Sequence, residues 1–211
     1  MGLKLVIFDL DGTLVNSDPT VLSIINNIRK KRGLKPVDYI QAKNSLAKGG
    51  EALIKDLITI KDIPKVLKEF RKDYLGASLM TEKLFPKAKE YLDYLKSKRY
   101  FLALLTNKPK ILTKKVLAHH DIDKYFDFIV TGCDVDKKKP DPEGLEKILK
   151  FFNLKNTETI YVGDNIIDYQ ASAKVGINFL FHDYENGKLL DDIKDNCSKF
   201  KSYEDLLRVK L

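Results

Sequence analysis

The sequence predicts an α/β protein built on a doubly wound parallel sheet, with an all-helical segment inserted after the first strand. Strand and helix patterns alternate over residues 1–14 and 81–211, as they do in parallel sheets whose strands are joined by helices. Residues 15–80 carry helical patterns and no convincing strand, which indicates an insertion. We therefore expect a core domain formed by 1–14 and 81–211 and a helical domain formed by 15–80.

Five short apolar runs, rich in β-branched and aromatic residues, predict the strands of the sheet. They are LKLVIF (3–8), YFLALLT (100–106), FDFIVT (126–131), TIYVG (159–163) and INFLF (177–181). Each run is short and nearly continuous in apolar residues, as expected for strands that are buried on both faces.

Apolar residues spaced three and four apart predict the helices. Those of the inserted segment cover 21–28, 37–47, 51–59 and 64–75. In the core domain, helices are expected from Pro86, over 110–119, from Asp141 and over 166–174. Asp141 suits an N-cap and Pro142 the first helical position. Ser202 and Asp205, three residues apart, predict a capping box at the start of a last helix.

The composition predicts a globular protein of the cytoplasm. Of the 211 residues, 44% are hydrophobic and 32% charged, and no apolar stretch approaches the roughly 18 residues of a membrane span. Asp9 and Asp11 interrupt the N-terminal apolar run, which argues against a signal peptide. Cys133 and Cys197 are too few for a disulfide framework and fit a reducing compartment.

The formal net charge of +8 is compatible with a nucleic-acid partner, an anionic substrate or a solvated lysine surface. The lysines are spread along the chain, and the densest cluster, DVDKKKPD (134–141), is flanked by acids rather than interleaved with aromatic residues. This distribution favours a solvated surface. We expect no nucleic-acid partner and no membrane partner.

Polar residues follow four of the predicted strands, at the edge where an open parallel sheet places its active site. In chain order they are Asp9 and Asp11 with Gly12 and Thr13, then Thr106 and Asn107, then Lys139, then Asp164 and Asp168. Four carboxylates brought together at one edge would repel one another unless a cation were bound. Because the donors are all oxygens, they favour Mg²⁺ over zinc.

Taken singly, each feature has a simpler interpretation. The first motif could form a turn or a calcium loop, but its glycine comes too early for an EF-hand, and Thr20 stands where that loop needs glutamate. Lys139 alone could be a solvated charge, and Asp164 alone could be a helix N-cap. The order of the motifs, each after a successive strand, favours one shared site.

With these motifs in this order, the chain resembles the phosphatases of the haloacid dehalogenase superfamily. The motifs are DLDGT at 9–13, TN at 106–107, KP at 139–140 and GDNIID at 163–168. The inserted segment resembles the helical cap of the branch that contains phosphoglycolate phosphatase and β-phosphoglucomutase. The resemblance implies a Rossmann-like core with strand order 5-4-1-2-3 and a helical cap domain.

The resemblance also implies catalytic roles. Asp9 would attack phosphorus and form an aspartyl-phosphate, and Asp11 would serve as general acid and then as general base. Mg²⁺ would be held by Asp9, Asp164 and the backbone carbonyl of Asp11, with Asp168 in support. Members of the superfamily that cleave other bonds lack an acid at the position of Asp11, so this residue favours cleavage of an oxygen–phosphorus bond.

The substrate would be held from two sides. Thr106 and the amide of Asn107 would bind the phosphoryl oxygens, and Lys139 would offset the charge of the phosphate. In the inserted segment, Lys48 could meet a substrate carboxylate or second phosphate, and Gly49 would allow a close approach; a turn with an exposed lysine explains both equally well. Phosphoglycolate phosphatases usually have a longer glycine run followed by a basic residue, whereas here Lys48 precedes the glycine pair.

The function expected is Mg²⁺-dependent hydrolysis of a small anionic phosphate monoester, phosphoglycolate-like, by a monomer or homodimer. A sugar-phosphate mutase of the β-phosphoglucomutase type is one alternative, and it would accumulate a bisphosphorylated sugar. A non-catalytic member that binds a partner is another, although the intact set of motif residues speaks against it. The three histidines follow none of the strand motifs, and no role is predicted for them.

Overall fold

The computed structural model describes residues 2–48, 50–58, 62–77, 79–184 and 197–209. The chain forms two compact units, one of Met1–Val15 with Leu84–Leu211 and the other of Asn16–Lys83. We call the first the core unit and the second the helical unit. Among the described residues, no helix combines the length and the hydropathy needed to cross a membrane.

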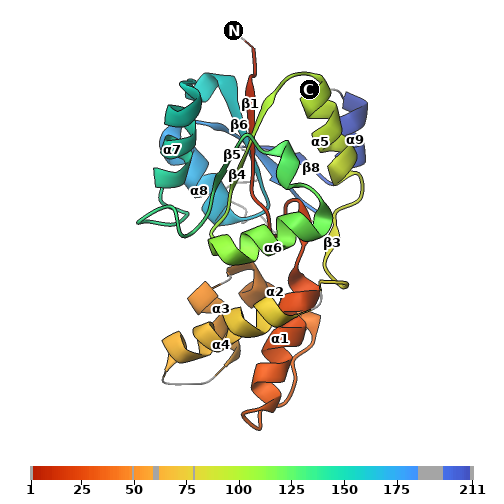
Figure 1. Cartoon of the computed structure of the whole chain (residues 1–211), viewed down its shortest axis with the longest axis vertical. Coiled ribbons are helices and arrows are strands. Elements are labelled where there is room, and N and C mark those ends of the chain that lie inside the picture. Colours follow the sequence, from red (N-terminus) through yellow and green to blue (C-terminus); the bar gives the residue numbers. More distant parts are fainter. Residues whose placement is uncertain (1, 49, 59–61, 78, 185–196, 210–211) are drawn as a thin grey trace. The chain divides into compact units, whose positions relative to one another are not determined.

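The core unit is built on a six-stranded parallel sheet with the order β5-β4-β1-β6-β7-β8 (Figure 1). Its strands are β1 (Leu5–Phe8), β4 (Phe101–Leu105), β5 (Phe128–Val130), β6 (Thr159–Gly163), β7 (Asn178–His182) and β8 (Ser198–Phe200). The five predicted strands take the expected order, which confirms the predicted fold class. The sixth, β8, was not predicted, because three residues with two exposed polar side chains carry no strand pattern until they pair with β7.

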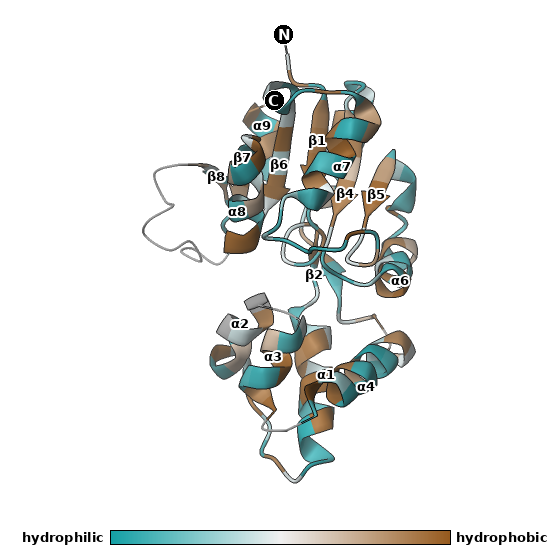
Figure 2. Ribbon diagram, turned by 90° about the vertical axis from the view of Figure 1, so that its left-hand side faces the viewer, coloured by the Kyte–Doolittle hydropathy of each residue, from teal (hydrophilic) through white to brown (hydrophobic). Residues whose placement is uncertain are grey.

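Helices cover both faces of this sheet. On one face lie α5 (Ala88–Ser97) and α9 (Tyr203–Val209), and on the other α7 (Glu143–Phe152) and α8 (Ile166–Val175) (Figure 1). Burial on both faces explains why all four residues of β1 are apolar and fully buried, and why the central strands are hydrophobic along their length (Figure 2). The remaining helix, α6 (Lys110–His120), joins β4 to the 3₁₀ turn η1 (Asp123–Tyr125) and then β5, and a second such turn, η2 (Asn156–Glu158), precedes β6.

The register of the sheet brings the ends of the central strands level. Phe8 of β1 pairs with Leu104 of β4 on one side and with Val162 of β6 on the other. The residue after β1 continues this pairing, since the backbone N–H of Asp9 donates to the carbonyl of Val162 over 2.9 Å. Polar residues that follow these strands therefore emerge at the same edge.

The helical unit contains α1 (Asp18–Lys30), α2 (Tyr39–Lys48), α3 (Gly50–Leu57) and α4 (Ile63–Gly76), which pack against one another. Each predicted helical pattern of the segment corresponds to one of them, although residues 37, 38 and 58 lie beyond the helix ends and residue 59 lies outside the described residues. Asp62 caps α4 by accepting from the backbone N–H of Lys65 at 3.1 Å. The segment was expected to be wholly helical, but the chain enters and leaves it through two short paired strands, β2 (Val15–Asn16) and β3 (Lys83–Leu84).

Two predicted helix starts are shifted. Pro142 occupies the N-cap position of α7 rather than its first turn, although the side chain of Asp141 still accepts from the backbone N–H of Glu143 at 3.1 Å. The helix expected from Pro86 begins two residues later, because Lys87 has a φ of +65°, which a right-handed helix cannot include. At the last helix one bond of the predicted capping box is present, since the backbone N–H of Asp205 donates to the hydroxyl of Ser202 at 3.2 Å, while the Asp205 side chain accepts from that hydroxyl at 2.7 Å.

Candidate active site

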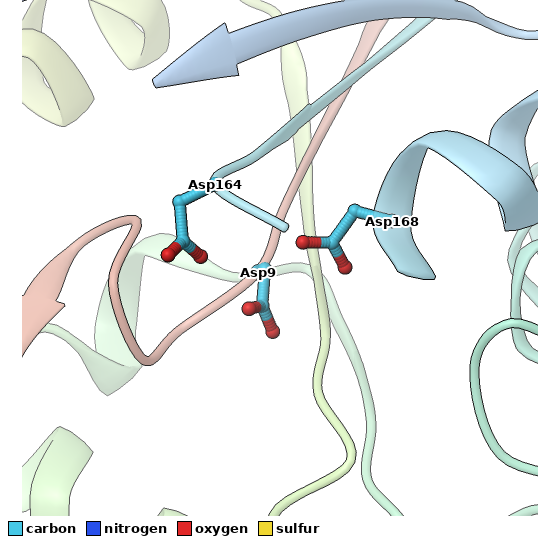
Figure 3. Close-up of side chains that lie close together, drawn as sticks. All are labelled: Asp9, Asp164 and Asp168. Carbon is cyan, nitrogen blue, oxygen red and sulfur yellow. The ribbon is translucent and has the colours of Figure 1, made fainter. Parts of the chain in front are cut away.

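Three carboxylates converge at the carboxyl edge of the sheet. Asp9 follows β1, Asp164 follows β6, and Asp168 lies in the first turn of α8, which Asn165 caps. One oxygen from each carboxylate lies within 4.8 Å of the other two, and all three residues are buried. Figure 3 shows the three side chains lying close together, each from a different segment of the chain.

A buried lysine, Lys139, bridges two carboxylates of this cluster. Its Nζ lies 2.8 Å from Oδ1 of Asp9 and 2.7 Å from Oδ1 of Asp168. It also donates to the hydroxyl oxygen of Tyr161 at 2.9 Å and to the carbonyl of Leu105 at 3.2 Å. The Tyr161 hydroxyl in turn donates to Asp168 at 2.8 Å. One ammonium group thus joins the residue after β1 to the helix that follows β6.

Asn107 fixes the backbone that carries this lysine. Its side-chain nitrogen donates to the carbonyl of Lys139 and its side-chain oxygen accepts from the N–H of the same residue, both over 3.0 Å. The neighbouring Thr106 is buried, and its hydroxyl accepts from the backbone N–H of Lys108 at 3.1 Å. The side chain of Asn107 is therefore engaged by protein, and the loop bearing Lys139 is tied to the end of β4.

Burial dominates the electrostatics of the cluster. It raises the pKa of Asp9 to about 7; the positive charge of Lys139 opposes this rise, and the charge of Asp168 adds to it. Burial alone would lower the pKa of Lys139, but the carboxylates of Asp168 and Asp9 outweigh it and hold that pKa above its usual value. The pKa of Tyr161 is well above its usual value, first because of burial and then because of Asp168, so its hydroxyl keeps its proton.

The residues of the cluster fit a divalent cation. Three buried carboxylates face one lysine, which leaves an excess of negative charge when all are ionised. Their ligand atoms are all oxygens, which suits Mg²⁺. Gly12 leaves the necessary space, because a Cβ at this position would lie 2.1 Å from Oδ2 of Asp164, and its φ of +82° favours glycine.

Asp11 lies outside this group of three carboxylates. Its Oδ1 accepts a hydrogen bond from Nζ of Lys108 at 2.7 Å, and the lysine side chain is only 8% exposed. Lys108 was not predicted to be a site residue, although it directly follows the Thr106–Asn107 motif and so lies near a strand end. A charged residue directly after a motif at a strand end was the feature of the sequence that could have identified it.

Residues near the C-terminus hold the loop after β1 in place. His182 Nδ1 lies 3.1 Å from the carbonyl of Gly12, and because a carbonyl only accepts, this nitrogen is the donor. The hydroxyl of Tyr203 donates to the carbonyl of Thr13 at 3.0 Å, and the Thr13 hydroxyl donates to Asp164 at 3.3 Å. No role was predicted for His182, but the residue directly follows the predicted strand 177–181 and so stands at the same edge.

The predicted substrate contacts in the inserted segment belong to the helical unit. Lys48 is the last residue of α2, but its side chain and the whole of Gly49 lie outside the described residues. Gly50 begins α3 with a φ of +52°, a conformation that glycine adopts without strain.

Comparison with known proteins agrees with this architecture. The model of the haloacid dehalogenase-like hydrolase family matches residues 6–182. The phosphoglycolate phosphatase of Aquifex aeolicus is 30% identical over 174 residues, 82% of each chain. That of Pseudomonas fluorescens is 29% identical over 196 residues, 88% of this chain and 72% of the relative. A crystal structure from Haemophilus somnus, described as a predicted phosphoglycolate phosphatase, has a TM-score of 0.88 at 27% identity and covers 99% of this chain and 98% of its own.

These matches extend over the core unit and the helical unit together. The chain belongs to the haloacid dehalogenase-like hydrolases, and it is a phosphatase of that family.

Proposed function

We propose that the protein is a Mg²⁺-dependent phosphomonoesterase that acts through an aspartyl-phosphate on a small anionic phosphorylated metabolite, with phosphoglycolate-like compounds as the substrate class. The observation that carries the proposal is the cluster of three buried carboxylates, Asp9, Asp164 and Asp168. Lys139 forms ion pairs with two of them, Asp9 and Asp168. The two curated relatives named above, which are phosphoglycolate phosphatases, support the substrate class.

In the first half-reaction, a carboxylate oxygen of Asp9 forms a bond to phosphorus while the bond from phosphorus to the leaving oxygen breaks. Asp11 gives its proton to that oxygen, so the alcohol leaves neutral. Thr106 and the backbone N–H of Asn107 hold the phosphoryl oxygens, since the Asn107 side chain is engaged with Lys139. Lys139 holds Asp9 in place and offsets negative charge.

In the second half-reaction, water attacks the phosphorus of the aspartyl-phosphate and the bond to Asp9 breaks. Asp11, now ionised, takes the proton of the water. Asp9, Asp164 and the backbone carbonyl of Asp11 would hold Mg²⁺, with Asp168 fixing their surroundings. When bound, the ion supplies positive charge that neutralises the phosphoryl oxygens as negative charge develops on them.

We assign the helical unit the role of a cap that selects the leaving group, with Lys48 meeting a substrate carboxylate or second phosphate. The position of the unit in the chain, between the nucleophile motif and the second motif, supports this role. The substrate is a small phosphate monoester, and the enzyme acts as a monomer or homodimer. Cys133 is a free thiol, which fits our assignment of the activity to the cytoplasm.

The direct test is phosphate release from a panel of monoesters, measured with Mg²⁺ and with EDTA. We expect release only with the metal, and one small anionic substrate, 2-phosphoglycolate first, favoured by roughly a hundredfold in kcat/KM over p-nitrophenyl phosphate. Sugar phosphates and nucleotides complete the panel. Release from none of them by folded protein would contradict the proposal, and accumulation of a bisphosphorylated sugar would replace it with the mutase.

Replacing Lys48 by alanine tests the substrate class. We expect KM for 2-phosphoglycolate to rise by roughly tenfold, because a charge-assisted contact to the carboxylate is lost, while KM for p-nitrophenyl phosphate stays within about twofold. Lys43, an exposed lysine of the same helix, provides the control, and its alanine variant should leave both values unchanged. Equal effects on the two substrates would show that Lys48 does not contact the carboxylate.

A further inference from the structure

The contact between Lys108 and Asp11 joins two loops that are far apart in the sequence and meet at the edge of the sheet. Nζ of Lys108 lies 2.7 Å from Oδ1 of Asp11. The lysine side chain is 8% exposed and the aspartate side chain 32% exposed. A nearly buried ammonium needs hydrogen-bond acceptors within the protein, and Oδ1 of Asp11 supplies one of them.

The backbone of Lys108 is anchored on both sides. Its N–H donates to the hydroxyl of Thr106 at 3.1 Å, and its carbonyl accepts from the N–H of Gly132 at 3.1 Å. The hydroxyl of Thr113 also donates to this carbonyl, over 3.4 Å. These bonds fix the start of the Lys108 side chain, and the low exposure of that side chain restricts where its ammonium group can lie.

The two lysines of the site contact different acids. Lys139 contacts Asp9 and Asp168, while Lys108 contacts Asp11. Among the described residues, Lys108 is the one side chain that donates a hydrogen bond to the Asp11 carboxyl. Its contact leaves Oδ2, the other oxygen of that carboxyl, for a proton.

We propose that Lys108 is a positioning residue that holds Asp11 for proton transfer to and from the substrate. This inference rests on the proposed function, in which Asp11 is the general acid and base. With Oδ1 held by Lys108, the proton on Oδ2 passes to the leaving oxygen as the phosphorus–oxygen bond breaks. Oδ2 then takes a proton from the attacking water. Lys108 keeps its own protons throughout and does not touch the substrate.

The test compares two leaving groups that differ in their need for a proton. The alkoxide leaving from 2-phosphoglycolate requires protonation, whereas the stable p-nitrophenolate does not. Because kcat/KM reports the first half-reaction, we expect Lys108→Met to lower it by about 30-fold or more for 2-phosphoglycolate but by less than about threefold for p-nitrophenyl phosphate. Lys108→Arg, which restores the cation, should recover part of the loss.

Three further variants make the result decisive. Asp11→Asn should show the same leaving-group discrimination, and the double variant with Lys108→Met should be no worse than Asp11→Asn alone, because both changes remove one function. Lys110→Met is the matched control, since Lys110 is exposed and pairs with Asp134 at 3.0 Å. It should behave as wild type.

Equal losses of kcat/KM for both substrates would overturn the inference and leave the proposed function standing. A rise in KM shared by both substrates would also overturn it, because Lys108 would then bind the phosphate. If the wild-type protein turned over neither substrate, the proposed function would fail and the inference with it.

Discussion

Asp9→Asn is expected to lower kcat by about four orders of magnitude, while the protein remains folded. The amide has nearly the same shape as the carboxylate, and its oxygen can still accept from Lys139, which lies 2.8 Å from Asp9 in the native protein. The amide cannot form the aspartyl-phosphate, so hydrolysis through this intermediate is no longer possible. Phosphate release by the variant and its circular dichroism, both beside wild type, check the expectation.

Rapid acid quenching separates the nucleophile from a residue that only binds metal. Wild-type protein mixed with substrate should carry phosphate on Asp9, and borohydride reduction should convert that residue to homoserine, which peptide mass spectrometry locates. The Asp9→Asn variant should carry none. Asp123→Asn, which changes an exposed aspartate of the core unit, is the control and should be fully active. Activity of Asp9→Asn within a hundredfold of wild type would refute the nucleophile assignment.

Lys139→Met is expected to destabilise the protein by about 3–5 kcal/mol in EDTA, because it leaves two buried carboxylates without their cation. The melting temperature should fall by on the order of 10 °C. Mg²⁺ should raise it again, and by more than it raises that of wild type, since the ion then supplies the missing positive charge. Thermal unfolding of both proteins in EDTA and in Mg²⁺ measures this.

The control for the loss of stability in Lys139→Met is Lys96, a lysine of the same unit that forms a more exposed ion pair. Lys96 lies 2.9 Å from Asp127, with about a third of each side chain exposed. Lys96→Met should cost no more than about 1 kcal/mol and should not respond to Mg²⁺. If the two variants lost the same stability, Lys139 would be no more than an ordinary ion-pair partner, and its central place in the proposed site would be wrong.

The site combines acids whose mutual repulsion is offset in part by a lysine of the protein, Lys139. Burial raises the pKa of Asp9 to about 7, so this carboxyl benefits from each positive charge near it. Lys139 supplies one such charge from within the protein, and the proposed Mg²⁺ supplies the other. A phosphate dianion entering the site would meet a cluster that is close to neutral, rather than one that repels it.

The sequence determined the fold class because its signals are local. Each predicted strand is a short apolar run, and the helices between successive runs indicate that the strands are parallel; the order of the strands was expected from the family resemblance. The same rule placed Asp9 and Asp164 at one edge, since the ends of parallel strands emerge together. Strand β8 was not predicted, because it is stabilised by pairing with β7 and its own three residues carry no strand pattern.

What the tertiary structure alone decided is which groups touch. The sequence assigned Lys139 to offset charge, but it did not show that one ammonium reaches both Asp9 and Asp168. The pairing of Lys108 with Asp11, which are 97 positions apart in the chain, could not be predicted from the sequence either. Periodicity and capping depend on neighbours within a few residues, and they fix the elements. Contacts between side chains of different loops depend on how the sheet sets those loops side by side, which only the folded chain specifies.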